Sequence, residues 1–309
     1  MNRHVAHAEL SYAPVLDHPQ PRVSVVMVVY WTGEALAESI RHVLADPLVD
    51  EFVVVDNGSP PEQEEMLREL GRREPRVLLI QGHGNVGFAK AANRGAKAAR
   101  GETLVFVNPD AFLQHNCVKM LANALKGRAA PSIVGACVLN ADGAEQRGGR
   151  RGEVTAITTL LSFAQLTGAF RKLKGFEIHR EHEALPRGVV SMPTISGACF
   201  ASRRADFMSL GGFDEGYFLH VEDIDLCWRA RKMGGEVLFQ PRAKVVHLGH
   251  TSLEHPVRVE FHKGVGLARY FMKRADKPHR FLLAAILAPL IMATAVIRPA
   301  LWKITGRPI

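Results

Sequence analysis

The stretch that decides the fold is Val23–Tyr30, which reads VSVVMVVY. Its apolar residues do not alternate with polar ones and valine dominates, which predicts a strand buried on both faces. Downstream, apolar runs alternate with amphipathic segments. Strands are expected at Glu51–Val55, Arg76–Gln81 and Thr103–Val107, and helices at Gly33–Ala45, Pro61–Arg73 and Phe88–Ala99. This order predicts an α/β fold with a mostly parallel central sheet flanked by helices.

The alternation becomes irregular after about residue 140. A basic, glycine-rich loop (GAEQRGGRRG) occupies residues 143–152, and residues 153–187 are loosely helical in pattern. Further elements are expected as a strand at Ser196–Ser202, a helix at Val221–Met233, and short strands at Glu236–Phe239 and Lys244–His247. We therefore divide the chain into an N-terminal extension (1–21), one large domain (22–255) and a C-terminal region (256–309).

Composition excludes several classes of protein. With 47% hydrophobic and 23% charged residues, the 309-residue chain is neither disordered nor collagen-like nor a polytopic membrane protein. The net charge of +8 lies in residues 256–309, where ten Lys or Arg face two acids, so a uniformly basic nucleic-acid surface is not expected. Four widely spaced cysteines and an N-terminus without an apolar core indicate a reducing, cytosolic setting.

The C-terminal region has the pattern of a membrane-associating helix. Phe281–Ile297 is apolar except for Thr294, is interrupted by Pro289, and has basic residues on both flanks. A helix of that length reaches about 26 Å, the lower limit for a bilayer core. We expect a monotopic or re-entrant anchor whose basic flanks contact anionic headgroups. The alternative is a buried C-terminal helix at a subunit contact.

The first candidate site residue is Asp56, which follows the strand Val53–Val55 and precedes a glycine turn. A carboxylate at the carboxyl end of a parallel strand can accept hydrogen bonds from the N–H groups or ribose hydroxyls of a ligand. The alternative is an N-cap for the next helix.

The segment 82–87 (GHGNVG) matches the dinucleotide-binding pattern G-x-G-x-x-G. The segment follows the third strand, whereas the dinucleotide-binding fingerprint belongs to the first strand–helix turn. The match is therefore weak evidence for a dinucleotide site. An oxidoreductase that binds a nicotinamide or flavin through Gly82, Gly84 and Gly87 remains an alternative of another class.

A third candidate site is Asn108-Pro109-Asp110, at the end of an apolar strand. One carboxylate fixed at the binding edge suits a divalent cation that also contacts phosphate oxygens. His247, which follows another apolar strand, could be a further metal ligand. An Asp that only caps a turn is the alternative.

The segment with the most candidate catalytic groups is Gly211–Arg229. It places Glu222, Asp223 and Asp225 at the start of an amphipathic helix. Acids favour a helix N-terminus, and Asp225 and Arg229 form an ordinary pair four residues apart. A carboxylate here could also serve as a general base.

Taken in order, these segments resemble glycosyltransferase family 2, the inverting nucleotide-sugar transferases with the GT-A fold, and within it the rhamnosyltransferase-like branch. The matching pieces cover about residues 22–252 and are Val23–Tyr30, Val53–Ser59, Gly84–Gly95, Gly101–Asp110, Ser196–Phe200, Gly211–Arg229 and Val245–Ser252. The resemblance implies a nucleotide-sugar-binding half (22–115) and an acceptor and catalytic half (116–255).

The resemblance also implies roles for single residues. Asp223 would be the catalytic base, next to Glu222 in the family's E-D pair. The nucleotide sugar would contact Tyr30, Asp56, Asn85, Lys90, Asn108 and Asp110. Asn108 stands at the first position of the D-x-D metal motif, so Asp110 would hold Mg²⁺ or Mn²⁺ together with His247. Ser196, Gly197 and Ala198 would face the acceptor. On physical grounds, we expect the cation and Arg229 to hold the pKa of Asp223 down.

One base without a protein nucleophile implies a single displacement with inversion at the anomeric carbon. The expected donor is dTDP-rhamnose, with UDP-galactofuranose or another UDP-hexose as alternatives. The expected acceptor is a polyprenyl-diphosphate-linked saccharide in cell-surface polysaccharide synthesis, and the expected location is the cytoplasmic face of the cell membrane. A non-catalytic saccharide-binding protein with the same fold is the other alternative.

Overall fold

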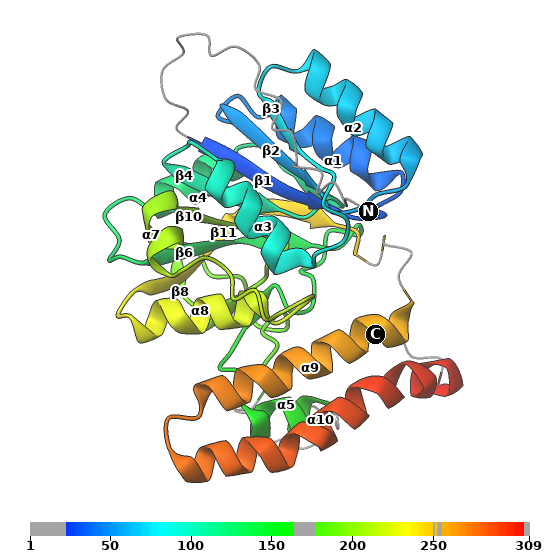
Figure 1. Cartoon of the computed structure of the whole chain (residues 1–309). Helices are drawn as coiled ribbons and strands as arrows, with labels where there is room; N and C mark the ends of the chain where they lie inside the picture. The colour runs from blue at the N-terminus through cyan, green and yellow to red at the C-terminus, as the bar shows by residue number, and fades with distance from the viewer. Residues whose placement is uncertain (1–22, 164–176, 250, 252–254, 306–309) are drawn as a thin grey trace, which may run out of the picture.

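A computed structural model describes residues 23–163, 177–249, 251 and 255–305 (Figure 1). The extension expected at 1–21 lies outside the described residues. The core is a mixed nine-stranded sheet in the order β3-β2-β1-β4-β10-β6-β11-β5, with β8 added beside β11. Its strands are β1 (Val23–Val29), β2 (Glu51–Asp56), β3 (Val77–Ile80), β4 (Thr103–Val107), β5 (Ala111–Leu113), β6 (Ser132–Leu139), β8 (Val190–Ser191), β10 (Cys199–Arg203) and β11 (Glu236–His247). The predicted α/β class is confirmed.

The first half of the sheet is parallel. β1 pairs with β2 on one side and β4 on the other, and every residue of β1 is buried. The register pairs Val29 with Asp56, so β1 and β2 end side by side. Because the chain passes from β1 to β2 and β3 and then returns to β4, the strand order reverses between β1 and β4. Ligands bind at this kind of switch point in open α/β sheets.

The second half of the sheet mixes parallel and antiparallel strands. β10 runs antiparallel to both β4 and β6, whereas β11 is parallel to β6. The prediction of two short strands at 236–239 and 244–247 is wrong, because β11 is continuous over Glu236–His247. Its register shifts between Gln240 and Lys244, at Pro241. A proline cannot donate to the ladder, so the strand bulges there without ending.

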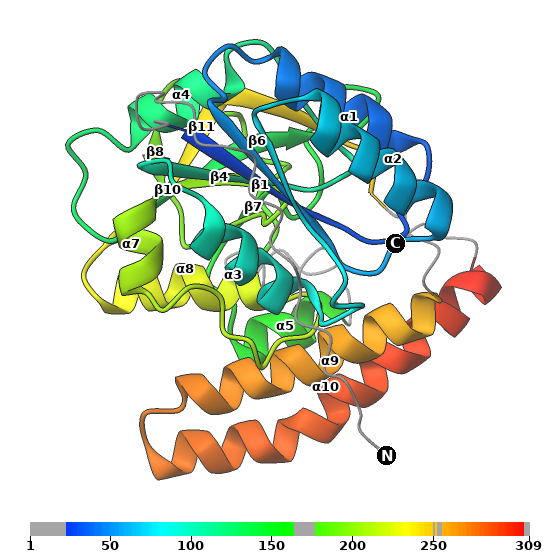
Figure 2. The ribbon, with the colours of Figure 1, turned by 45° about the horizontal axis from the view of Figure 1, so that its top comes forward.

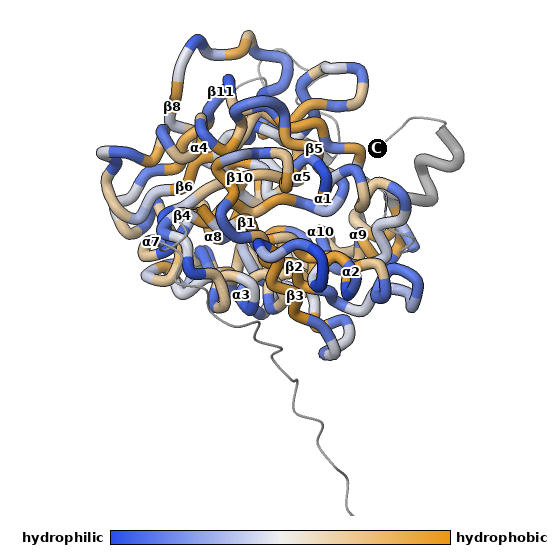
Figure 3. The backbone as a smooth tube through the Cα atoms, turned by 90° about the horizontal axis from the view of Figure 1, so that it is seen from above, coloured by the Kyte–Doolittle hydropathy of each residue, from blue (hydrophilic) through white to orange (hydrophobic). Residues whose placement is uncertain are grey.

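Helices cover both faces of the sheet (Figure 2). On one face lie α1 (Ala35–Ala45), α2 (Pro61–Arg73) and α4 (Cys117–Ala124), and on the other α3 (Phe88–Ala98), α7 (Arg204–Ser209) and α8 (Glu222–Lys232). Hydrophobic residues follow β1, β2 and β3 through the middle of the molecule, and polar residues lie on the loops and outer helices (Figure 3). This two-sided burial explains the uninterrupted apolar runs in the sequence.

A helical hairpin packs beneath this domain (Figure 1). It consists of α9 (Pro256–Arg274) and α10 (Pro278–Thr305), with α5 (Ala156–Phe163) beside α10. A third apolar cluster joins the hairpin to α8 through Ile224, Leu267 and Tyr270. A two-stranded sheet of β7 (Arg150–Arg151) and β9 (Thr194–Ile195) completes the described elements.

One face of α10 is buried and the other is open. Ala284, Ile291 and Ala295 are buried, and a Cβ at Gly264 of α9 would lie 3.1 Å from the Ala295 Cβ. The opposite side exposes Phe281, Leu282, Leu283, Ile286, Leu290 and Ile297. By length and composition Pro278–Ile297 could cross a membrane, and 17% of its apolar window is buried. The exposed side is the surface that either expectation from the sequence, a membrane anchor or a subunit contact, would cover.

Candidate active site

The carboxyl end of β2 forms a tight polar turn. Asp56 is 1% exposed, and its Oδ1 accepts the backbone N–H groups of Gly58 and Ser59 at 3.2 and 2.9 Å. The next residue, Asn57, donates to Asn85 Oδ1 at 3.0 Å and thereby joins this turn to the loop before α3. Both bonds lie within the turn, and the N-cap of the next helix is Pro60, so the N-cap alternative for Asp56 is wrong. The other oxygen, Oδ2, lies outside these bonds.

The remaining residues expected at the nucleotide lie around this turn. Tyr30 follows β1 directly, and its ring lies 6.3 Å from that of Trp31. The Trp31 indole donates to the Gly58 carbonyl at 3.1 Å, a contact that the sequence did not suggest. Asn85 and Lys90 are both exposed, and Asn85 joins the turn through its bond with Asn57.

At the end of β4, the turn 108–110 meets the end of β11. His247 Nε2 lies 3.1 Å from Asp110 Oδ1 and 3.3 Å from Asn108 Nδ2. Thr251 donates its hydroxyl to Asp110 Oδ2 at 2.9 Å. Asp110 and His247, predicted from positions 137 residues apart, are therefore in direct contact through the antiparallel pairing of Ala111 with His247.

Gln146 fixes the orientation of the His247 ring. Its amide nitrogen donates to Asn140 Oδ1 at 3.0 Å and to the His247 carbonyl at 2.9 Å, so its oxygen must face the ring. That oxygen lies 2.7 Å from His247 Nδ1, which therefore carries a hydrogen. The Nε2 atom then faces the Asp110 carboxylate. Metal-binding histidines have this arrangement, with one nitrogen held by an outer acceptor and the other directed at the ion.

The environment of Asp110 keeps its carboxyl ionised. Burial acts to raise its pKa, but hydrogen bonds from His247 and Thr251 and the charge of His247 outweigh burial, and the net pKa lies below its ordinary value. The donor set of one carboxylate oxygen and one imidazole nitrogen fits a divalent cation such as Mn²⁺. Within the described part of the chain, no three His, Cys, Asp or Glu side chains gather as a metal cluster. A cation here would take its remaining ligands from phosphate and water.

Asp223, the predicted base, lies at the start of α8 and is held by two groups. Its Oδ2 accepts the Gly197 backbone N–H at 3.0 Å and lies 2.5 Å from Arg151 Nη2. Gly197 permits this approach, because a Cβ there would lie 3.2 Å from the Asp223 Cβ. The prediction that Arg229 acts on Asp223 is wrong. Arg229 lies one helical turn beyond Asp225 and pairs with that residue at 2.6 Å.

Glu222, the neighbour of the base, is buried. It is 7% exposed, and its Oε2 atom has no hydrogen-bond partner. Burial, reinforced by the negative charge of Asp223, raises the pKa of Glu222 to about 8. Glu222 is therefore mostly protonated at neutral pH.

Short contacts join the base to the other predicted residues. Ala198 follows Gly197, and its carbonyl accepts the Asn108 backbone N–H at 2.9 Å. Asp223 is thus linked through Gly197 and Ala198 to the Asn108–Asp110 turn. On the other side, the Phe218 carbonyl accepts the backbone N–H of Phe88 at 2.8 Å, which places the loop before α8 against the start of α3. The structure brings the predicted catalytic, metal and acceptor residues into one network.

The residues just before the base are strained. His220 and Val221 have φ values of +66° and +73°, a region that costs energy for any residue with a Cβ and most for a β-branched one. Helix α9 holds them in place, since a Cβ at Gly266 would lie 3.0 Å from Val221 Cγ2 and 3.3 Å from the His220 carbonyl oxygen. The Phe218 and His262 rings also stack at 4.6 Å. The C-terminal hairpin therefore directly supports the loop that precedes Asp223, the predicted base.

Comparisons with known proteins identify the family of the chain. Residues 24–209 match the family model "Glycosyl transferase family 2". The chain belongs to this family. It is a glycosyltransferase that uses a nucleotide-sugar donor. An oxidoreductase that uses Gly82, Gly84 and Gly87 and a non-catalytic saccharide-binding protein are both excluded.

Individual relatives are more distant. The chain is 27% identical over 241 residues to N-acetylglucosaminyl-diphospho-decaprenol L-rhamnosyltransferase of Mycobacterium tuberculosis, covering 72% of this chain and 75% of the relative. Among solved structures it resembles a mannosyltransferase from Pyrobaculum calidifontis in complex with GDP-Man and Mn²⁺ (TM-score 0.56, 18% identity, 97% of this chain and 80% of the other). It also resembles GalNAc-T7 with UDP, GalNAc and Mn²⁺ (TM-score 0.58, 18% identity, 87% and 55%). The GT-A fold is confirmed.

Proposed function

We propose that this glycosyltransferase transfers L-rhamnose from dTDP-rhamnose, with inversion, to a saccharide on a polyprenyl diphosphate, as a step in cell-surface polysaccharide synthesis. The observation that carries the proposal is the contact path from Asp223 through Gly197 and Ala198 to the Asn108–Asp110 turn. It connects a positioned base with a candidate site for the leaving diphosphate. The named activity of the mycobacterial relative supports the choice of sugar and acceptor.

In this proposal Asp223 takes the proton of the acceptor hydroxyl, and that hydroxyl oxygen attacks the anomeric carbon as the bond to the diphosphate breaks. Gly197 and Arg151 hold the Asp223 carboxylate during attack. Glu222 cannot act as a nucleophile while it is buried and protonated. A single displacement then inverts the anomeric configuration.

Asp110 and His247 would hold a divalent cation, with Asn108 beside them. A bound cation would neutralise the charge that develops on the leaving nucleoside diphosphate. In this proposal the nucleoside contacts Asp56, Tyr30, Asn85 and Lys90. The Mn²⁺ named in the two structural neighbours supports the same choice of cation.

We further propose that the exposed side of α10 lies on the cytoplasmic face of the cell membrane. α10 packs along α9, which carries charged residues and holds the catalytic loop, so α10 runs beside the domain. This arrangement favours a helix lying in the interface over one that spans the bilayer, and the basic residues of the hairpin suit anionic headgroups.

The proposal is tested by thermal shift and transfer assays with matched donors. We expect dTDP with Mn²⁺ or Mg²⁺ to raise the melting temperature more than UDP or GDP, and EDTA to remove most of the effect. We also expect dTDP-rhamnose to support transfer to a saccharide acceptor with inversion, as determined by NMR of the product. A preference for UDP, with transfer from UDP-galactofuranose or another UDP-hexose, would contradict the rhamnosyl assignment.

A further inference from the structure

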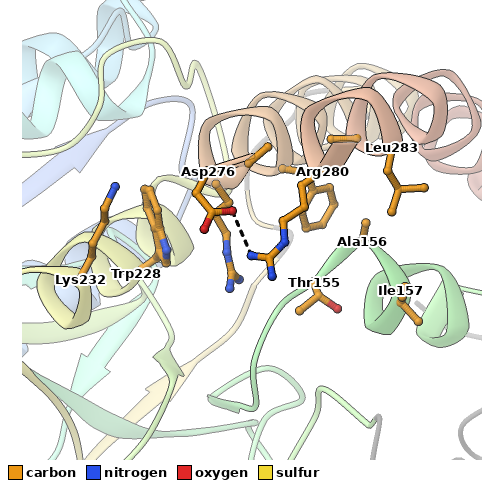
Figure 4. Close-up of a pocket in the computed structure, with 12 residues that line it drawn as sticks. Thr155, Ala156, Ile157, Trp228, Lys232, Asp276, Arg280 and Leu283 are labelled. Atoms are coloured by element: carbon orange, nitrogen blue, oxygen red, sulfur yellow. Dashed lines mark hydrogen bonds and ion pairs between the residues drawn. The ribbon is translucent and has the colours of Figure 1, made fainter. Parts of the chain in front are cut away.

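A pocket of about 620 Å³ lies between α5, α8 and the turn of the C-terminal hairpin. Trp228 and Lys232 border it from α8, Ile157 from α5, and Arg280 and Leu283 from α10 (Figure 4). Its volume is in the range of small-molecule sites, and its walls combine aromatic, apolar and cationic side chains. A ligand bound there touches the main domain and the hairpin together.

The pocket is separate from the candidate active site. Trp228 and Lys232 follow Asp223 by five and nine residues, so they lie about 140° and 180° around α8 from it. Arg274, which also lines the pocket, is held by an ion pair with Glu153 at 2.7 Å. A ligand held at Lys232 therefore does not reach Asp223, so the ligand of this pocket is not the reacting sugar.

The charges around the pocket favour an anion. Lys232, Arg274 and Arg280 line it together with the carboxylate of Asp276. Arg280 pairs with Asp276 at 3.0 Å, and both side chains are more than half exposed, so this pair opens at little cost. The Lys232 ammonium lies 5.0 Å from the centre of the Trp228 ring, and among the residues that the structure describes no carboxylate forms an ion pair with it. Lys232 and Arg280 are therefore the cations that an anionic group can reach.

Part of the pocket wall is apolar and open to solvent. Ile157 and Leu283 line the pocket and are 55% and 48% exposed. The exposed side chains of Ile286 and Leu290 follow Leu283 along α10. A small soluble anion leaves these side chains in water, whereas an amphiphile covers them with its chain. The ligand that fits both parts of the pocket is a phosphate group joined to a long apolar chain.

Trp228 has the surroundings of a side chain at a membrane interface. Its ring packs edge-on against Tyr270 of α9 at 6.2 Å, and the Lys232 ammonium lies over it. Trp and Lys are typical of the boundary between hydrocarbon and headgroups, because each combines an apolar body with a polar end. Since the pocket is bordered by α10, a membrane on the exposed side of that helix brings headgroups to Trp228.

We propose that this pocket binds the headgroup of an anionic phospholipid, with its phosphate at Lys232 and Arg280 and an acyl chain over Leu283 and Ile286. The inference rests on the proposed membrane location, because the lipid enters from a membrane beside α10. A zwitterionic headgroup places its own cation against Lys232 and Arg280 and is disfavoured. The pocket thus adds a headgroup selectivity that the apolar side of α10 cannot supply.

The test is titration of the full-length chain with three soluble probes: dihexanoyl-phosphatidylglycerol, dihexanoyl-phosphatidylcholine and glycerol 3-phosphate. The background W31F/W302F leaves Trp228 as the one tryptophan of the chain, so its fluorescence reports binding. We expect dihexanoyl-phosphatidylglycerol to bind at least about tenfold more tightly than either other probe. Equal affinity for glycerol 3-phosphate would indicate a site for soluble phosphates, and equal affinity for the phosphatidylcholine an unselective apolar surface. Either result would overturn the proposal.

Two variants in the same background locate the binding. K232Q/R280Q should weaken dihexanoyl-phosphatidylglycerol at least about tenfold, because two charge-assisted contacts to phosphate are lost. Ile157→Glu, at an exposed position, should weaken it by charge repulsion. The matched control K119Q/K126Q removes two exposed lysines near α4 and should bind like the unmodified background. Unchanged affinity in both pocket variants would overturn the assignment.

Sedimentation of the wild type with phosphatidylglycerol vesicles separates this inference from the proposed membrane location. Sedimentation without binding of the soluble lipid would overturn the pocket assignment and leave the membrane location standing. Binding of the soluble lipid that K232Q/R280Q abolishes, without sedimentation, would support the pocket and contradict the proposed membrane location.

Discussion

The ammonium of Lys273, in α9, lies 2.8 Å from the carboxylate of Asp225, which is fully buried in α8 two residues after Asp223. The same ammonium lies 2.7 Å from Asp214. Asp225 also accepts hydrogen bonds from Arg229 and Tyr217 at 2.6 and 3.3 Å. This cluster fastens the C-terminal hairpin to the helix that carries Asp223, although both lie beyond the region matched by the family model.

Replacing Lys273 by Met should therefore destabilise the protein and slow transfer. Removing one partner of a buried ion pair costs about 3–5 kcal/mol, and partial exposure of Lys273 together with the remaining bonds of Asp225 reduces this to about 1–3 kcal/mol. Urea unfolding measures the change. Lys277→Met, in the exposed turn of the same hairpin, is the control and should stay within about 0.5 kcal/mol of the wild type. Equal stability of both variants would show that the cluster does not hold the hairpin.

Glu222 should make stability depend on pH. Its pKa of about 8 in the folded protein lies above its ordinary value of 4.5, so the folded state retains a proton that the unfolded state has lost between these values. The contribution of this proton to the free energy of unfolding is complete below about pH 4.5 and is lost as the pH rises through 8. The free energy of unfolding of the wild type should fall by roughly 2 kcal/mol more than that of Glu222→Gln between about pH 6.5 and 8.

Urea unfolding of both proteins over this pH range gives the difference directly. The lower limit avoids His179, whose pKa is lowered to about 3 mainly by burial and which affects stability below its ordinary value of 6.5. Parallel pH curves for the wild type and Glu222→Gln would mean that Glu222 is ionised in the folded protein at neutral pH.

Gln146 should control the affinity for the cation through the His247 ring. Gln146→Leu removes the acceptor at Nδ1 and leaves the proposed metal ligands Asp110 and His247 in the chain. Loss of such an outer partner lowers metal affinity by about 10–100-fold. The measurement is Mn²⁺ binding by electron paramagnetic resonance in the presence of dTDP, with Gln63→Leu on α2 as the matched control. Unchanged Mn²⁺ binding in Gln146→Leu would argue that His247 does not hold the ion.

The exposed side of α10 should bind anionic membranes. The triple variant L282Q/I286Q/L290Q removes three exposed apolar side chains, each contributing roughly 1 kcal/mol or more to burial in a membrane. Sedimentation with phosphatidylglycerol vesicles should fall at least about tenfold. The control L48Q/L185Q/M233Q changes exposed apolar residues on the main domain and should sediment like the wild type. Truncation at Lys273 is unsuitable, because the deletion would also disturb the catalytic loop.

The parts of the fold that could be predicted depend on local patterns. Uninterrupted apolar runs identified β1, β2 and β4, and the parallel order placed Asp56 and Asp110 at one edge of the sheet. The single strand β11 was not predicted, because Pro241 interrupts the strand pattern of the sequence. In the structure a bulge at this proline lets the pairing with β6 continue on both sides. Element order could not show that α9 supports Val221, since that contact depends on the close approach allowed by Gly266.

The contacts among the candidate site residues could be predicted where a motif supplies both partners, and were missed where a side chain comes from a distant loop. Asp223, Gly197 and Asp110 lie in recognisable segments and are joined by short contacts. Arg151 lies 72 residues before Asp223 in a loop noted only for its basic charge, and no spacing links the two. Arg229 was favoured in its place because helical neighbours are visible in a sequence and tertiary partners are not.

The central claim is that Asp223 is the base of the transfer reaction. The most direct measurement is a paired assay of Asp223→Asn, with sugar transfer from dTDP-rhamnose and dTDP affinity determined on the same preparation. A general base contributes about 10²–10⁴-fold to rate, so transfer should fall by about 10³-fold while dTDP binds as it does to the wild type. Asp142→Asn, at an exposed turn, controls for loss of a carboxylate. Retained transfer, or loss of dTDP binding together with transfer, would contradict the account.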